Sequence, residues 1–270
     1  MKLFPNPRPY WYVDAKWICG ILLVFSLSAT LILLSLVKLT EPERAPTVGA
    51  LIIGMGFIRG NTVDTEEARE ALAEAGGVIQ PIPNIPSIKI TEADLALSPS
   101  EISIKVFKPI TESIYNDGIE ATADKFAATP EQKAKFIKDA ALFNIFTKDT
   151  HQTLKKFFNI FAVLSLLLAA GVAYFSARWG RLSNLGSLIL LVSLPGTLIA
   201  LLLKSPPKDG SGGFGSLSPE LTTQVGQSVS AAYTKVTLFG LFLLAAALVG
   251  RTYSLIHRPK SKTKPSPKPA

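Results

Sequence analysis

The alternation of apolar and polar stretches along the chain predicts four membrane-spanning helices. A helix needs about 20 apolar residues to cross the hydrocarbon core of a bilayer. Four stretches approximate this length, at residues 17–37, 157–175, 182–203 and 236–256. Their spacing is uneven, with a long polar segment, 38–156, between the first two. The pattern predicts an all-α integral membrane protein with four transmembrane helices and an α-helical extracytoplasmic domain between helices 1 and 2.

Helix-start signals recur within 38–156. An N-cap residue followed three positions later by an acid or an amide is typical of a helix N-terminus, and proline at the first helical position strengthens it. Such pairs are Asp64 with Glu67, Thr91 with Asp94, Ser98 with Glu101, and Thr129 with Gln132. A further start is expected at Asp149, leading directly into the second span. The segment is therefore predicted to form a small helical domain.

The clearest amphipathic helix in this domain follows Ser98. Its apolar stripe repeats every four residues and ends near Asn116-Asp117-Gly118. The stripe comprises Ile102, Val106, Ile110 and Ile114. Pro109 interrupts it and is expected to kink or split the helix.

Two other parts of the domain have no such helical signal. Residues 77–90 contain three prolines and are expected to form an extended rim without strands. The apolar, glycine-rich run 46–58 is too short to cross a bilayer. It is consistent with a segment at the outer surface, a re-entrant pore element or a part of the domain.

Charge placement predicts the orientation. Basic residues concentrate on the cytoplasmic side of membrane proteins. The N-terminal segment 1–16, the turn 176–181 and the tail 257–270 are all basic, whereas 38–156 contains more acids than bases. Both termini are therefore predicted to be cytoplasmic, and 38–156 and the loop 204–235 extracytoplasmic. This distribution also explains the net charge of +8 without a nucleic-acid partner.

The first span is predicted to be an uncleaved signal anchor, because its apolar run is longer than a signal-peptide core. Cys19 is the single cysteine of the chain, so the outer domain folds without a disulfide. No Asn-x-Ser/Thr sequence occurs either. Both features favour a prokaryotic plasma membrane.

The flanks of the spans contain residues suited to the lipid surface. Tyr10, Trp11, Tyr12 and Trp17 are typical of the headgroup layer, although the surrounding prolines also fit a Pro-rich ligand for a partner domain. The tail 257–270 is predicted to be disordered. Its lysines are expected to contact anionic lipid.

No residue pattern identifies a catalytic, cofactor or metal site. Residues 210–215 match G-x-G-x-x-G, but no strand precedes them, so a flexible linker is the better interpretation. His151 and His257 are the only histidines and are predicted on opposite membrane faces. Glu66, Glu67 and Glu70 could bind calcium but equally describe a solvated helix face. The sequence thus indicates a non-enzymatic protein.

The spans have no ionisable residue near their centres, which argues against a proton-coupled transporter. Residues 193–197, Ser-Leu-Pro-Gly-Thr, are consistent either with a packing kink or with an interrupted helix that forms a transport site.

The order of one span, a large outer domain and three further spans is similar to permeases of the macrolide-exporter class of ABC transporters. That resemblance implies a cytoplasmic coupling segment between spans two and three. Residues 176–181 are too short for one, so no family assignment follows. The leading hypothesis is a scaffold, assembly or sensing protein whose outer domain binds an envelope protein, a second copy or a small ligand. The alternative is a transport or channel component that uses residues 193–197.

Overall fold

The computed structural model describes residues 10–60, 78–79, 90–127, 129–204 and 219–257. Within this part of the chain, four helices are long and apolar enough to cross a membrane. They are α1 (Trp11–Leu39), α6 (Lys148–Phe175), α7 (Gly180–Lys204) and α8 (Pro219–Ile256). The prediction of a multi-pass, predominantly helical membrane protein is confirmed.

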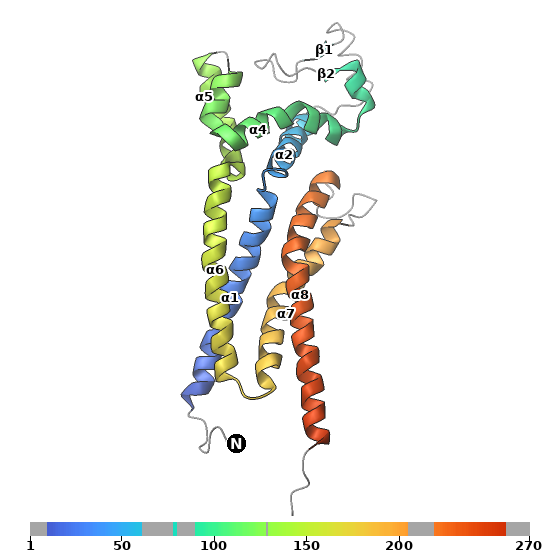
Figure 1. The fold of residues 1–270 in the computed structure, drawn as a ribbon. Coiled ribbons are helices and arrows are strands. Elements are labelled where there is room, and N and C mark those ends of the chain that lie inside the picture. The colour runs from blue at the N-terminus through green and yellow to red at the C-terminus, as the bar shows by residue number, and fades with distance from the viewer. Residues whose placement is uncertain (1–9, 61–77, 80–89, 128, 205–218, 258–270) are drawn as a thin grey trace, which may run out of the picture.

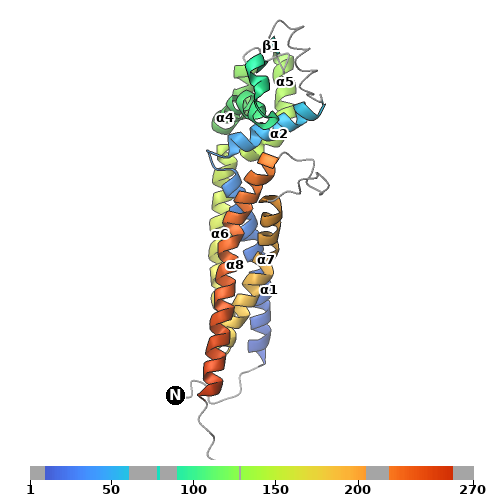
Figure 2. The same ribbon diagram turned by 90° about the vertical axis from the view of Figure 1, so that its right-hand side faces the viewer.

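The four helices form two antiparallel pairs. α1 packs mainly on α6 and α7 on α8, and α1 also contacts α7 and α8 between the pairs (Figures 1 and 2). The described chain starts and ends at the same end of the bundle, where α6 and α7 are joined by a short turn. α8 begins at Pro219 and continues past the end of α7 at the opposite end of the bundle.

A group of shorter helices, the helical cap, covers that opposite end of the bundle (Figure 1). It contains α2 (Ala45–Gly60), the 3-10 helix η1 (Glu92–Ala96), α4 (Pro99–Phe126), α5 (Pro130–Asp139) and the 3-10 helix η2 (Ala140–Phe146). Its buried core consists of Ala50, Val106, Phe107, Ile110, Ile114, Ile119 and Ala140. Three residues of the predicted stripe after Ser98, Val106, Ile110 and Ile114, belong to this core, and Ile102 packs against it. Residues 46–58 belong to α2, which packs against α4.

Three predicted helix starts in the cap are confirmed. Thr91, Ser98 and Thr129 are N-caps with reciprocal capping boxes to the third residue of each helix. The Ser98 backbone amide donates to Glu101 Oε2 at 2.8 Å. These contacts satisfy amides that a helix N-terminus leaves without partners. The predicted start at Asp64 lies outside the described residues.

Two details of the predicted helices are wrong. α4 continues through Pro109, and its backbone departs from helical torsions only at Gly118, where the stripe was predicted to end, with φ 85° and ψ 170°. Glycine adopts positive φ without a Cβ clash, so the break falls where the chain can make it most easily. The N-cap of α6 is Thr147, whose hydroxyl accepts from the Thr150 amide, and Asp149 lies in the first turn.

The expectation of no strand and the expected N-terminal boundary also require correction. Val78–Ile79 (β1) and Ile90–Thr91 (β2) pair antiparallel, with Val78 opposite Thr91 and Ile79 opposite Ile90. Each strand has only two residues, which is too short to show the alternation of apolar and polar positions by which a strand is predicted. α1 begins at Trp11, within the N-terminal segment 1–16 and before the expected first residue of the span, residue 17.

Glycines allow two close helix contacts that position the cap and the bundle. A Cβ added to Gly54 of α2 would lie 2.0 Å from Ser103 Oγ of α4. A Cβ added to Gly196 of α7 would lie 2.2 Å from the Tyr233 ring of α8. The Pro195-Gly196 pair therefore lies in a close contact between two helices, and α7 is helical throughout 193–197.

Candidate functional site at the base of the helical cap

Thr40, which follows α1, connects the first and second spans at the base of the cap. Its side chain is buried, and its Oγ1 donates to the Leu36 carbonyl at 2.8 Å. His151 Nδ1 of α6 lies 3.0 Å from the same oxygen. Because the hydroxyl has one proton and gives it to Leu36, this geometry favours the tautomer in which His151 Nδ1 donates.

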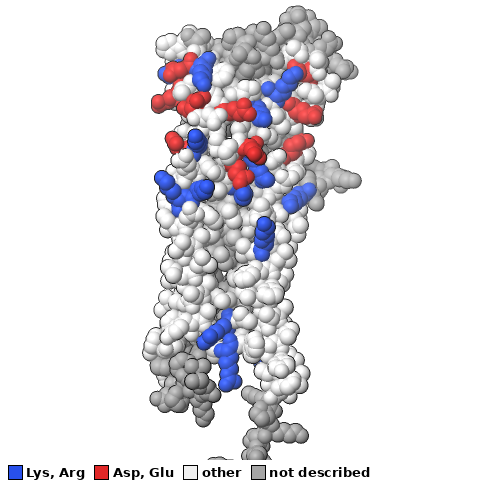
Figure 3. Space-filling model, in the orientation of Figure 1, with Lys and Arg blue, Asp and Glu red and all other residues white. Residues whose placement is uncertain are grey.

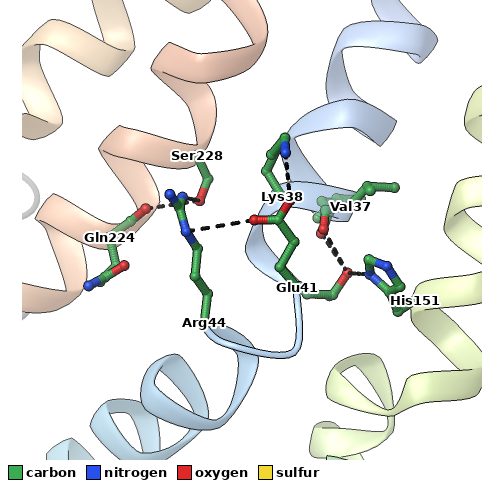
Figure 4. A network of polar contacts seen from close by, with 9 residues as sticks. Val37, Lys38, Glu41, Arg44, His151, Gln224 and Ser228 are labelled. Atoms are coloured by element: carbon green, nitrogen blue, oxygen red, sulfur yellow. Dashed lines mark hydrogen bonds and ion pairs between the residues drawn. The ribbon is translucent and has the colours of Figure 1, made fainter.

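A second group of polar contacts extends from this point to α8 (Figure 4). Glu41 lies between Lys38 Nζ at 2.5 Å and Arg44 Nε at 3.9 Å. Arg44 Nη1 donates to Ser228 Oγ at 3.3 Å, and Ser228 donates to the Gln224 carbonyl at 3.0 Å. The charged side chains are about one third exposed, so each ion pair adds at most about 1 kcal/mol of stability. The network instead positions α1, α2 and α8 relative to one another.

Two further contacts join α8 to the cap. Ser100 Oγ of α4 donates to Glu220 Oε2 at 2.5 Å. Leu221 is buried against Val48 and Leu51 of α2. The cap therefore contacts both helix pairs, since it is continuous with α1 and α6 and packs on the N-terminal end of α8.

An apolar pocket of about 540 Å³ lies beside this junction. Its walls come from the last turn of α1, the middle of α2 and the short helix η2. They are formed by Leu36, Leu39, Ile52, Ile53, Leu142, Phe143, Ile145 and Phe146. Leu142 is 85% exposed and Ile145 54% exposed, so part of the wall is open. Small-molecule sites are commonly apolar concavities of roughly 300–1,000 Å³, and this pocket lies in that range.

Polar side chains inside the bundle bind one another. Ser165 of α6 lies 2.9 Å from Ser26 Oγ and 3.1 Å from Thr30 Oγ1 of α1. Thr197 Oγ1 of α7 lies 2.7 Å from Thr237 Oγ1 of α8 and donates to the Ser193 carbonyl. These hydrogen bonds are typical of packed membrane helices. Ser193 Oγ is buried without a partner among the described residues.

The residues considered as candidates for a catalytic, cofactor or metal site do not form one site in the described part of the structure. His151 is at the cap end of the bundle, whereas His257 follows α8 at the other end and stacks on Tyr253. Residues 210–215, Glu66, Glu67 and Glu70 lie outside the described residues. Among the described residues, no three His, Cys, Asp or Glu side chains gather in a way that would hold a metal ion.

Sequence reasoning missed both the pocket and the junction beside it. The signal for the pocket is the apolar run Leu142 to Phe146 directly before the Thr147 cap. This run forms a 3-10 helix, which has about 3.0 residues per turn and therefore a different side-chain periodicity from an α-helix. A search for 3.6-residue stripes therefore does not find the surface that this run forms.

The four spans and the cap define the class of protein: a multi-pass α-helical membrane protein with a helical assembly at one end of its bundle. Comparison with protein-family models, with curated proteins and with solved structures gives no match.

Proposed function

We propose that this chain is a non-enzymatic protein of a prokaryotic plasma membrane whose helical cap, outside the cytoplasm, binds an envelope protein or a ligand. A scaffold, assembly or sensing role follows from that activity. The observation that carries the proposal is the apolar pocket with its exposed rim residues Leu142 and Ile145. Open apolar surface at a fixed place on a protein commonly marks an interaction site.

Charge supports the orientation. The cap contains acidic and basic side chains together, whereas the basic residues at the other end have few acids among them (Figure 3). Arg178, Arg181 and Arg251 lie at that other end of the described bundle. In a Cys19→Ser background, a cysteine at Glu131 of the cap is expected to react with a membrane-impermeant maleimide in intact cells. A cysteine at Ser254 is expected to be protected. The reverse pattern would refute the orientation.

The binding role is tested by photo-crosslinking in native membranes. A photoreactive residue at Leu142 or Ile145 is expected to give one reproducible protein adduct or small-ligand adduct. The matched control is Leu97, an exposed apolar residue of the cap outside the pocket. No adduct at Leu142 and Ile145, or the same adducts from Leu97, would refute the proposal.

The alternative is a transport component that uses residues 193–197. The Ser193 hydroxyl is buried without a partner in the described part of the chain, which favours transport. The unbroken course of α7 and the close contact of Gly196 with Tyr233 favour a packing role. Cysteines at positions 193–197 distinguish the two. Reaction with water-soluble reagents would support transport, and complete protection would support packing.

A further inference from the structure

The pocket lies at the level where the hydrocarbon core ends. Leu36 and Leu39 belong to the last turn of the α1 span, and Lys38 and Glu41 are the first charged residues after its apolar run. Charged side chains near the end of a span reach the headgroup layer. The end of the α1 span therefore forms one wall of the pocket, and Ile52 and Ile53 of α2 line it as well.

The wall chemistry matches a hydrocarbon chain. All eight lining residues are apolar. Leu142 and Ile145 of η2 are exposed at this level. Water at the membrane boundary would fill such a pocket poorly, because an apolar cavity offers it no hydrogen-bond partners. Acyl chains of the adjoining leaflet are the most concentrated apolar groups at this depth.

Two lysines are placed to meet the headgroup of such a lipid. Lys148, His151 and Lys155 occupy positions i, i+3 and i+7 of α6 and therefore share one face. His151 contacts Thr40, which directly follows Leu39 of the pocket wall. Lys148 and Lys155 are exposed and form no ion pair with another described residue.

We propose that the pocket holds one acyl chain of an anionic phospholipid from the adjoining leaflet, with its phosphate on Lys148 and Lys155. This inference rests on the pocket as the binding site of the proposed function, and it names the ligand class. It does not depend on a protein partner.

The test uses the full-length purified chain in nanodiscs that contain phosphatidylglycerol and phosphatidylcholine in equal amounts. A photoreactive residue at Ile145 is expected to give an adduct of phospholipid mass, with phosphatidylglycerol strongly preferred. A second position, Leu166, faces outward from α6 and is 72% exposed. It reports ordinary contact with bulk lipid and is expected to show no preference.

Substitution of the lysines then tests the headgroup contact. Each basic residue near an anionic lipid contributes about 1 kcal/mol, which corresponds to a preference of about five-fold per lysine. Lys148→Gln and Lys155→Gln are each expected to lower the preference at position 145 by about this factor. Lys135→Gln changes the same charge on α5, which contributes no residue to the pocket wall, and is expected to leave the preference unchanged.

The pocket wall is tested separately. Leu142→Gln is expected to reduce the adduct yield at 145 several-fold, and Leu97→Gln to leave it unaltered. Equal lipid ratios at 145 and 166, or a preference that survives both lysine substitutions, would overturn the inference. Because purified protein contains no partner, this outcome is independent of the crosslinking result in native membranes, and the two proposals can fail separately.

Discussion

The close contact between Gly54 and Ser103 gives a quantitative prediction for the stability of the cap. A Cβ at position 54 would lie 2.0 Å from Ser103 Oγ and 2.3 Å from Ser103 Cβ. Both distances are far inside van der Waals contact, so Gly54→Ala forces α2 and α4 apart. Overpacking of this kind costs about 3 kcal/mol at the upper end of its range. Alanine returns about 1 kcal/mol of helix propensity, which leaves a net destabilisation of about 2 kcal/mol.

The paired substitution shows whether this contact is the cause. Ser103→Gly removes the two nearest atoms and leaves the Ser103 Cα at 3.4 Å, an ordinary contact distance. Alone, it is expected to cost about 0.5 kcal/mol through lost helix propensity, because serine is an intermediate helix former. The double variant exchanges the glycine between the helices and is expected to be about as stable as the parent. The coupling energy between the two sites is then about 3 kcal/mol.

Pulse proteolysis of the full-length chain in mild micelles measures these differences. Trypsin cleaves α4 at Lys105 only in molecules whose cap has unfolded, so the cut fraction across a urea titration reports the free energy of unfolding of the cap. Parent stability for Gly54→Ala would refute the packing argument. A double variant no more stable than Gly54→Ala would refute the pairing of Gly54 with Ser103.

Three further outcomes are expected. Hydrogen bonds from Lys105 and from the Thr91 amide lower the pKa of Asp94 from 3.8 to about 2. The stabilisation of the cap by the Asp94 carboxylate is therefore present above pH 3.8 and is lost as the pH falls to about 2. Circular dichroism in urea should show this loss of stability, and Asp94→Asn should abolish the pH dependence. Ser165→Ala removes hydrogen bonds to α1 and should cost about 1 kcal/mol in an SDS titration of the bundle; a neutral result would show that these bonds contribute nothing. Gly196→Ala should destabilise the bundle by about 1–3 kcal/mol, and Tyr233→Ala in the same chain should relieve this clash, unless α7 moves away as a whole.

Elements whose structure is determined by one local signal can be predicted from the sequence. The length of the apolar runs was sufficient for the four spans, and the Ser98 and Thr129 capping boxes located the starts of α4 and α5. Pro109 shows the limit of this approach. A proline removes one backbone hydrogen bond, but the packing of Phe107 and Ile110 keeps the helix intact across it. The expected kink or split at Pro109 is therefore wrong, whereas the predicted end of the stripe near Asn116-Asp117-Gly118 coincides with the loss of helical torsions at Gly118.

The candidate site could not be predicted in the same way because its parts are brought together only by the tertiary fold. Leu39 and Phe146 line one pocket from opposite ends of the cap segment. Arg44 and Ser228 are 184 residues apart in sequence. No periodicity in a single chain segment encodes such a meeting. Only Leu142 to Phe146, an apolar run placed directly before a helix cap, gave a local indication of it.

The contacts of α8 with the cap determine the order in which the molecule can be completed. Val48 and Leu51 emerge from the ribosome before any of the later spans, yet Leu221, which covers them, belongs to α8. Glu220 and Ser228 likewise meet Ser100 and Arg44 only after that helix has been made. During synthesis the apolar face of the cap that contains Val48 and Leu51 therefore stays uncovered until α8 is inserted. A ribosome stalled before Pro219 would leave this face open to proteases and chaperones.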